Sequence, residues 1–245
     1  MRLRFLILAA IAAAPCAALA EDILIVADEI PAMQNLAKQW EEKTHLTSKI
    51  VTQTEMPASL AGFKTVAVYI HKDIAEGPEH AMLDYTRNGG KLMLLHHSIS
   101  SAKRKNQDWL PYFQITLPTG KFDDGGYAYF NPATFDVVNL APHNPIATKG
   151  VHYDKKVDYQ GKQLDGFEVA NTEIYVNHQF DGPRTKLLGI KFTEPKSGKT
   201  IEQDSAGWMM KRDKGTVFYF MVGHKDRDFD IPPYLQILTN ALIAK

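Results

Sequence analysis

Two histidines and a serine, His96, His97 and Ser98, directly follow a short apolar run, Leu92 to Leu95. A run of this length without polar residues is typical of a strand covered on both faces in an α/β sheet. In open α/β sheets, ligands bind outside the carboxyl ends of the strands. Because imidazole rings exchange protons near neutral pH, these side chains could do acid–base chemistry there. The segment predicts a polar site at the edge of a sheet.

Two more candidate residues come from strand-like runs in the second half of the chain. Glu173 lies within the segment 166–176, and His224 follows the run 216–222. If these segments meet the end of the earlier strand, His97, Glu173 and His224 can exchange protons with a hydroxyl or carbonyl group. A partly desolvated glutamate would have its pKa raised toward neutrality for this role. The residues expected to position the substrate are His96, Ser98, Tyr175 and Trp109.

The order of the predicted elements favours a parallel sheet wrapped by helices. Apolar runs at 23–27 and 65–70 predict buried strands. Apolar residues recur at helical spacing over 33–40, and a second helix is expected over about 78–87. The glycine- and aspartate-rich stretch 120–131 is expected to be irregular. Later strands are expected at 166–176, 186–192, 207–210 and 216–222, with a hairpin turn at 211–215 and a final helix over about 233–244.

Four motifs occur in order along the chain: Gly89-Gly90 with a strand ending in His97-Ser98, His143-Asn144-Pro145-Ile146, Thr172-Glu173-Ile174-Tyr175, and Gly223-His224. In these residues the chain resembles the trehalose-utilisation (ThuA-like) family, in which the third motif reads Asp-Glu-Leu-Tyr. The resemblance implies a flavodoxin-like three-layer α/β sandwich related to class I glutamine amidotransferases. In that fold a mostly parallel central sheet is joined by additional antiparallel strands in the second half. The resemblance also implies sugar utilisation, for which Trp109 could stack on a sugar ring.

Two functions remain open at this point. The first is an enzyme that acts on a sugar or sugar derivative by acid–base chemistry, as a hydrolase or an isomerase. The second is a non-catalytic module that binds a small carbohydrate or docks a partner on the same fold. The family often has a glycine- and histidine-bearing loop after its first strand, whereas this chain has Asp28-Glu29-Ile30-Pro31. That departure favours the second function somewhat.

Glutamine amidotransferase activity is excluded on chemical grounds. That reaction needs a cysteine on a strand-to-helix elbow with a histidine to activate it. The only cysteine is Cys16, and the elbow position holds His96-His97-Ser98. A serine hydrolase with Ser98 as nucleophile, His224 as base and Glu173 as orienting group is a weaker alternative. It lacks the Gly-x-Ser-x-Gly frame that exposes such a serine.

A divalent metal is a secondary hypothesis for the same residues. Two histidines and one glutamate suit Zn²⁺ or a similar ion. However, His97, Glu173 and His224 are far apart in the sequence, and no His-x-x-x-His or His-Glu-x-x-His spacing brings ligands together locally. The sequence alone therefore favours proton transfer over metal binding.

The amino terminus predicts export. Arg2 and Arg4 precede an apolar run over 5–14, and Ala18-Leu19-Ala20 offers small residues for cleavage after Ala20. This pattern is typical of a secretory signal peptide over residues 1–20, followed by a single domain over 21–245. We expect a periplasmic or secreted protein. No other stretch is apolar enough to serve as a membrane anchor.

The charge composition points to no nucleic-acid partner. Lysine and arginine number 28, and aspartate and glutamate also number 28, so the formal net charge is zero. Such a balance leaves no basic surface of the kind that binds phosphate backbones. The basic triplet Lys103-Arg104-Lys105 is expected to be a solvated loop. Composition gives no indication of the oligomeric state.

Overall fold

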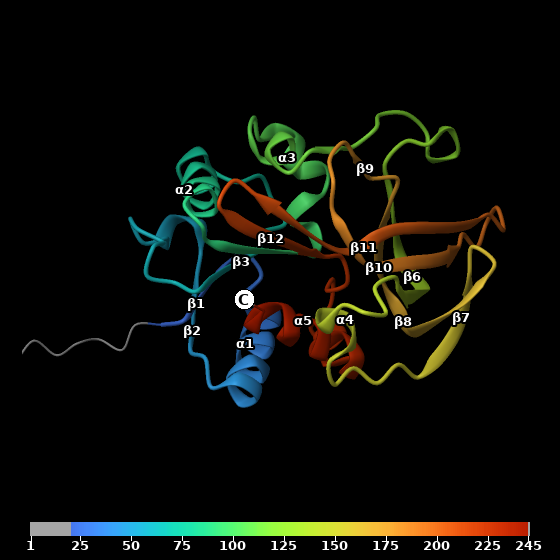
Figure 1. Cartoon of the computed structure of the whole chain (residues 1–245). Coiled ribbons are helices and arrows are strands. Elements are labelled where there is room, and N and C mark those ends of the chain that lie inside the picture. Colours follow the sequence, from blue (N-terminus) through green and yellow to red (C-terminus); the bar gives the residue numbers. More distant parts are fainter. Residues whose placement is uncertain (1–20, 245) are drawn as a thin grey trace, which may run out of the picture.

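The computed structural model describes residues 21–244, and its centre is one ten-stranded sheet (Figure 1). The expected signal peptide, residues 1–20, lies outside the described residues. The strand order is β2-β1-β3-β4-β12-β11-β10-β6-β8-β7. The first five strands in this order are parallel: β2 (Ser48–Val51), β1 (Ile23–Ala27), β3 (Thr65–Tyr69), β4 (Lys91–Leu95) and β12 (Gly215–Phe220).

The other half of the sheet is antiparallel and is built from long strands. These are β11 (Thr200–Arg212), β10 (Thr185–Thr193), β6 (Ala128–Asn139), β8 (Lys162–Val176) and β7 (Lys155–Tyr159). A separate small sheet pairs β5 (Ile115–Thr116) with β9 (Gln179–Phe180). The expected α/β fold, parallel first and antiparallel later, is confirmed.

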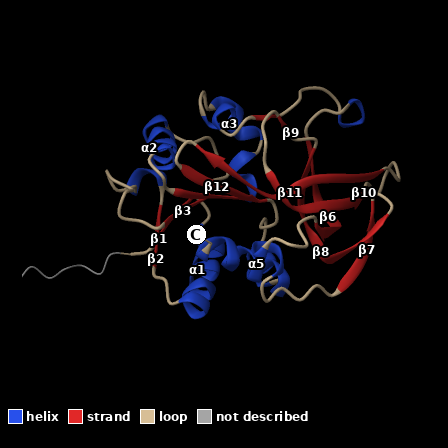
Figure 2. Ribbon diagram, viewed as in Figure 1, coloured by secondary structure: helices blue, strands red, loops and turns tan. Residues whose placement is uncertain are grey.

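Helices cover both faces of the parallel strands (Figure 2). Helices α2 (Glu76–Arg87) and α3 (Trp109–Tyr112) lie on one face, and α1 (Ile30–Thr44) and α5 (Pro232–Ile243) lie on the other, with α4 (Pro145–Thr148) against α5. This double cover explains why every residue of β1 and β3 is buried. Within residues 21–244, no helix is both long enough and apolar enough to cross a membrane.

Strand β6 departs from the sequence prediction. The stretch 120–131 was expected to be irregular, yet Ala128–Asn139 forms a strand that pairs with β8. Pro132 interrupts the strand-like pattern, since proline cannot donate to a ladder. The register shifts between Phe130 and Ala133, and the pairing tolerates the proline at that irregularity.

A buried lysine ties together the loops that follow β3 and β4. Lys103 has no exposed surface, and its ammonium donates to the backbone carbonyl oxygens of Ile70, His71, Lys72 and His97 at 2.6 to 3.2 Å. The expectation that Lys103-Arg104-Lys105 forms a solvated loop is therefore wrong for Lys103. An ammonium can be buried when carbonyl oxygens replace its water shell.

Replacing Lys103 with methionine should destabilise the fold. Methionine has a similar length but donates no hydrogen bond, so four carbonyl oxygens would lose a charged donor. We expect the free energy of unfolding to fall by about 3 kcal/mol, measured by urea denaturation. Lys105→Met is the control, because Lys105 is exposed and its ion pair with Asp73 is long, at 3.5 Å. Equal losses in the two variants would contradict this role.

Candidate functional site

Titratable side chains gather where the parallel strands end. Glu29 follows β1, His71 follows β3, His96 and His97 follow β4, and His224 follows β12. Parallel strands present their carboxyl ends at one edge of the sheet, which is where α/β proteins bind ligands.

One group of three residues, the edge cluster, consists of His96, Glu173 and His224. Nε2 of His96 lies 3.5 Å from Oε1 of Glu173, and Nδ1 of His224 lies 3.9 Å from the same oxygen. One ligand atom from each residue lies within 4.8 Å of the others. The side chains of His96, Glu173 and His224 are 0%, 11% and 26% exposed, so the cluster meets solvent mainly through His224.

The backbone around His96 fixes its ring. His96 begins a short 3-10 turn, and its φ of 47° is unusual for a residue with a side chain. Nδ1 of its ring lies 2.6 Å from the carbonyl oxygen of Met221, and the Tyr219 hydroxyl donates to the His96 carbonyl at 3.0 Å. Such a conformation persists only where its surroundings hold it, and it is common at functional sites.

Two neighbours complete the edge cluster. The Tyr175 hydroxyl lies 3.4 Å from Nε2 of His96. Nδ2 of Asn131 lies 3.0 Å from Nε2 of His224 and 3.4 Å from Oε2 of Glu173. Sequence reasoning placed Tyr175 near the site but missed Asn131, because its segment was expected to be irregular and gave no signal for a polar contact.

Glu173 is ionised, which corrects the expectation of a raised pKa. Burial by itself would raise this pKa, but the contacts of the carboxylate with the His96 ring and with the Tyr175 hydroxyl bring it to about 2. Burial lowers the pKa of His224. The cluster thus pairs a carboxylate with a neutral imidazole that solvent can reach.

His97, expected beside Glu173, belongs to a second group with Glu29 and His71. Nε2 of His97 lies 3.6 Å from Glu29, and Nδ1 of His71 lies 3.3 Å from it. Burial lowers the pKa of His97 to about 4. The rings of His96 and His97 are 4.6 Å apart between centroids, so the two groups are adjacent. The structure thus places His96, rather than His97, beside Glu173 and His224.

Ser98 and Trp109, expected to position substrate, lie in the core instead. The Ser98 hydroxyl donates to the carbonyl oxygen of Val68 at 2.6 Å, and Nε1 of Trp109 donates to that of Ser98 at 2.7 Å. Neither side chain has exposed surface. Trp109 is therefore not available to stack on a sugar, and Ser98 is not placed as a nucleophile.

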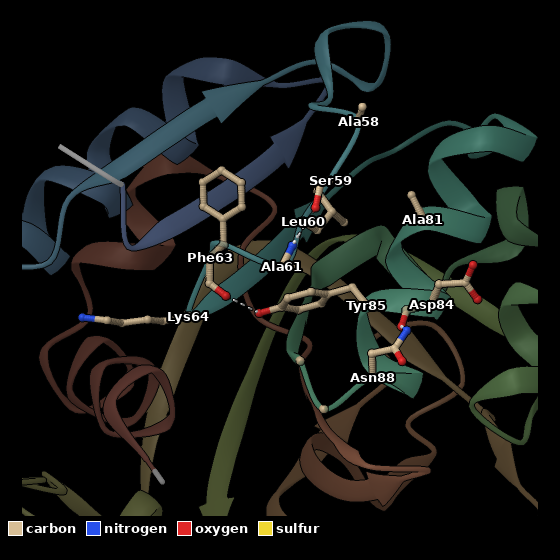
Figure 3. A pocket seen from close by; sticks show the side chains of 12 residues that line it. Ala58, Ser59, Leu60, Ala61, Phe63, Lys64, Ala81, Asp84, Tyr85 and Asn88 are labelled. Carbon is tan, nitrogen blue, oxygen red and sulfur yellow. Dashed lines mark hydrogen bonds between the residues drawn. The ribbon is translucent and has the colours of Figure 1, made fainter. Parts of the chain in front are cut away.

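A cavity of about 640 Å³ lies at the other edge of the sheet, beside the Gly89-Gly90 turn that precedes β4 (Figure 3). Tyr85 crosses it and donates a hydrogen bond to the carbonyl oxygen of Phe63. Its charged residues, Lys64 and Asp84, have ion-pair partners. Because histidines and unpaired carboxylates do not line it, this cavity is a weaker candidate for chemistry than the edge cluster.

The fold and the site define an α/β protein whose polar groups converge at the carboxyl ends of its parallel strands. The sequence profile of ThuA, trehalose utilisation, matches residues 22–243. The chain belongs to the ThuA family.

Solved structures with the same fold share little sequence with this chain. A protein from Bacteroides uniformis described as ThuA-like is 18% identical, with a TM-score of 0.61 over 91% of each chain. A GH42 beta-galactosidase from G. stearothermophilus is 13% identical, with a TM-score of 0.54 over 90% of this chain and 30% of its own. A carbohydrate deacetylase is 10% identical, with a TM-score of 0.54 over 90% of this chain and 32% of its own. A comparison with curated proteins finds no significant match.

His178, the residue two positions after the end of β8, is buried among aromatic rings. Its ring lies against Tyr127, Tyr175, Phe180 and Tyr219, and both ring nitrogens lack a hydrogen-bond partner within the described residues. Burial lowers its pKa from 6.5 to about 3. His178 is therefore neutral in the folded protein at pH 7.

His178 should make the fold sensitive to acid. Between pH 6.5 and 3 the unfolded chain binds a proton here that the folded chain does not, so stability is lost as the pH falls through this window. His178→Leu removes this loss. The unfolding free energy of the variant minus that of the wild type should increase by about 2 kcal/mol as the pH falls from 7.5 to 5, measured by urea denaturation. Parallel pH profiles of the two proteins would contradict the assignment.

Proposed function

We propose that this protein acts on a sugar or sugar derivative at the edge cluster, by acid–base chemistry of the hydrolysis or isomerisation type. Membership of the ThuA family supports a carbohydrate-related role. The observation that carries the proposal is the convergence of His96, Glu173 and His224 from distant parts of the chain. A buried charged group beside two imidazoles is costly for stability, and such arrangements concentrate at functional sites.

The residues of the edge cluster would have different roles in the reaction. Glu173 holds its negative charge, so it accepts a hydrogen bond from a hydroxyl group or stabilises a developing positive charge. A carboxylate with so low a pKa is a weak base. The proton acceptor is therefore either the neutral imidazole of His224 or a water molecule that the cluster activates.

An exposed aromatic ring beside the site supports a sugar as ligand. Tyr129 lies opposite Tyr175 in the β6–β8 pair and is 61% exposed. Directly opposed residues of an antiparallel pair point to the same face, so Tyr129 lies on the same face of the sheet as Tyr175. A flat aromatic face exposed there can pack against the apolar face of a sugar ring.

The second candidate function is a non-catalytic binding module. It is favoured by the segment after β1, where this chain has Asp28-Glu29-Ile30-Pro31 instead of the glycine- and histidine-bearing loop that is frequent in the family. The Asp28 carboxylate accepts hydrogen bonds from the backbone N–H groups of His71 and Lys72, so this segment braces a neighbouring loop. A module of this kind would bind a carbohydrate at the same edge without transforming it.

Substitutions in the edge cluster separate the two functions. Glu173→Gln and His224→Ala should each lower turnover on the order of 10²- to 10⁴-fold, because each removes a group that handles a proton or its charge. Turnover would be followed by NMR across a panel that includes trehalose, other disaccharides and keto sugars, with circular dichroism to confirm folding. Glu168→Gln, an exposed carboxylate on the same strand β8, is the matched control. Unchanged turnover in Glu173→Gln would refute the assignment, and sugar binding without turnover would establish the binding module.

We also propose that the protein is exported, on the basis of Arg2, Arg4 and the apolar run 5–14. Cleavage after Ala20 would give a mature chain that begins at Glu21. Expression of the full chain in a bacterial host, followed by mass spectrometry of the periplasmic fraction, should find this amino terminus. An intact Met1 chain that stays in the cytoplasm would contradict export.

A further inference from the structure

The hydrogen bond of His96 to Met221 determines which ring nitrogen carries a proton. Nδ1 of His96 lies 2.6 Å from the carbonyl oxygen of Met221. A carbonyl oxygen only accepts hydrogen bonds, so Nδ1 must be the donor. In the neutral ring, Nε2 then presents a lone pair toward the centre of the edge cluster.

Electron-rich atoms therefore face one another in a buried place. Nε2 of His96 lies 3.5 Å from a carboxylate oxygen of Glu173. Nδ1 of His224 lies 3.9 Å from the same oxygen and has no hydrogen-bond partner in the described part of the chain. A positive charge at the centre would satisfy all three groups at once.

The spacing of these atoms suits a metal ion. Two ligands about 2.1 Å from a tetrahedral ion lie about 3.4 Å from each other. The separations of His96 and His224 from the Glu173 oxygen, 3.5 and 3.9 Å, are near this value, and ligand atoms of all three residues lie within 4.8 Å of one another. The hydrogen bond from Nδ1 of His96 to a backbone carbonyl is the usual support for a metal-binding histidine.

We propose that the edge cluster binds one first-row divalent metal ion of the zinc class, through Nε2 of His96, the Glu173 carboxylate and Nδ1 of His224. Two imidazoles and a carboxylate are a ligand set that leaves a position open for water or substrate. The inference builds on the proposed function, because a water molecule on such an ion would lose a proton at a pH of about 7, and the hydroxide that remains would serve as the proton acceptor. His224 would then be a ligand.

The neighbouring group of Glu29, His71 and His97 has the same residue types but the wrong ring geometry. The rings of His71 and His97 are stacked, with centroids 4.7 Å apart and planes only 4° from parallel. A nitrogen lone pair lies in the plane of its ring, so two stacked parallel rings cannot aim at one ion. In the edge cluster the rings of His96 and His224 are inclined by 56°, which allows their lone pairs to converge.

Asn131 gives the proposal a specific consequence. Its side-chain amide lies 3.0 Å from Nε2 of His224. A metal ion on Nδ1 requires a hydrogen on Nε2, so the residue at 131 must then accept a hydrogen bond. An aspartate accepts it better than an amide does and adds negative charge beside the ion. Asn131→Asp should therefore tighten metal binding.

The test is an isothermal calorimetric titration of the full, chelator-treated protein with ZnCl₂. Metal analysis after dialysis then gives the amount of ion that stays bound. We expect about one Zn²⁺ per chain. Glu173→Gln and His224→Ala should each weaken binding by on the order of 100-fold or more, and Asn131→Asp should strengthen it by about tenfold. His71→Ala, in the neighbouring group, is the matched control and should bind as the wild type does.

Several results would overturn the metal site. These are no binding of Zn²⁺, Co²⁺ or Mn²⁺, binding that survives Glu173→Gln, or binding lost in His71→Ala. The titration contains no sugar, so its failure leaves the proposed sugar chemistry standing, with His224 as the proton acceptor. Conversely, metal binding without turnover of any sugar would uphold the metal site and refute the catalytic function.

Discussion

The ammonium of Lys103 and the carboxylate of Asp28 hold one loop from two sides, and the candidate site depends on that loop. Lys103 donates to carbonyl oxygens of the segment after β3, and Asp28 accepts from its backbone N–H groups. Burial lowers the pKa of Lys103 to about 8. The ammonium also reaches the carbonyl oxygen of His97, so the ends of β3 and β4 are fixed relative to each other. The two histidine groups can lie side by side because these ends cannot drift apart.

The edge cluster and the neighbouring group of Glu29, His71 and His97 contain the same residue types, but their histidine rings are oriented differently. In each set a buried histidine, a carboxylate and a more exposed histidine lie together. Stacking of His71 on His97 confines their lone pairs to separate parallel planes, whereas the hydrogen bond to the Met221 carbonyl holds the His96 ring toward Glu173. Residue composition alone would not distinguish the two sets. Their difference lies in a few backbone contacts.

Local patterns in the sequence predicted much of the fold, and long-range contacts account for what they missed. The runs that became β1, β3 and β4 are apolar because both faces are covered, so a single-sequence pattern sufficed. The same pattern placed His96 and His97 at a strand end. It could not say which of them faces Glu173, because that depends on the left-handed backbone of His96. The burial of Lys103 and the contact of Asn131 likewise depend on partners distant in the sequence.

The edge cluster joins the parallel half of the sheet to the antiparallel half. His96 and His224 follow parallel strands, whereas Glu173 comes from β8, on the far side of β11, β10 and β6. A nascent chain therefore has no such cluster until β12 has been synthesised and inserted between β4 and β11. A chain that ends before this strand lacks His224 and therefore the complete edge cluster. The complete edge cluster therefore exists only once strands of both halves of the sheet have paired.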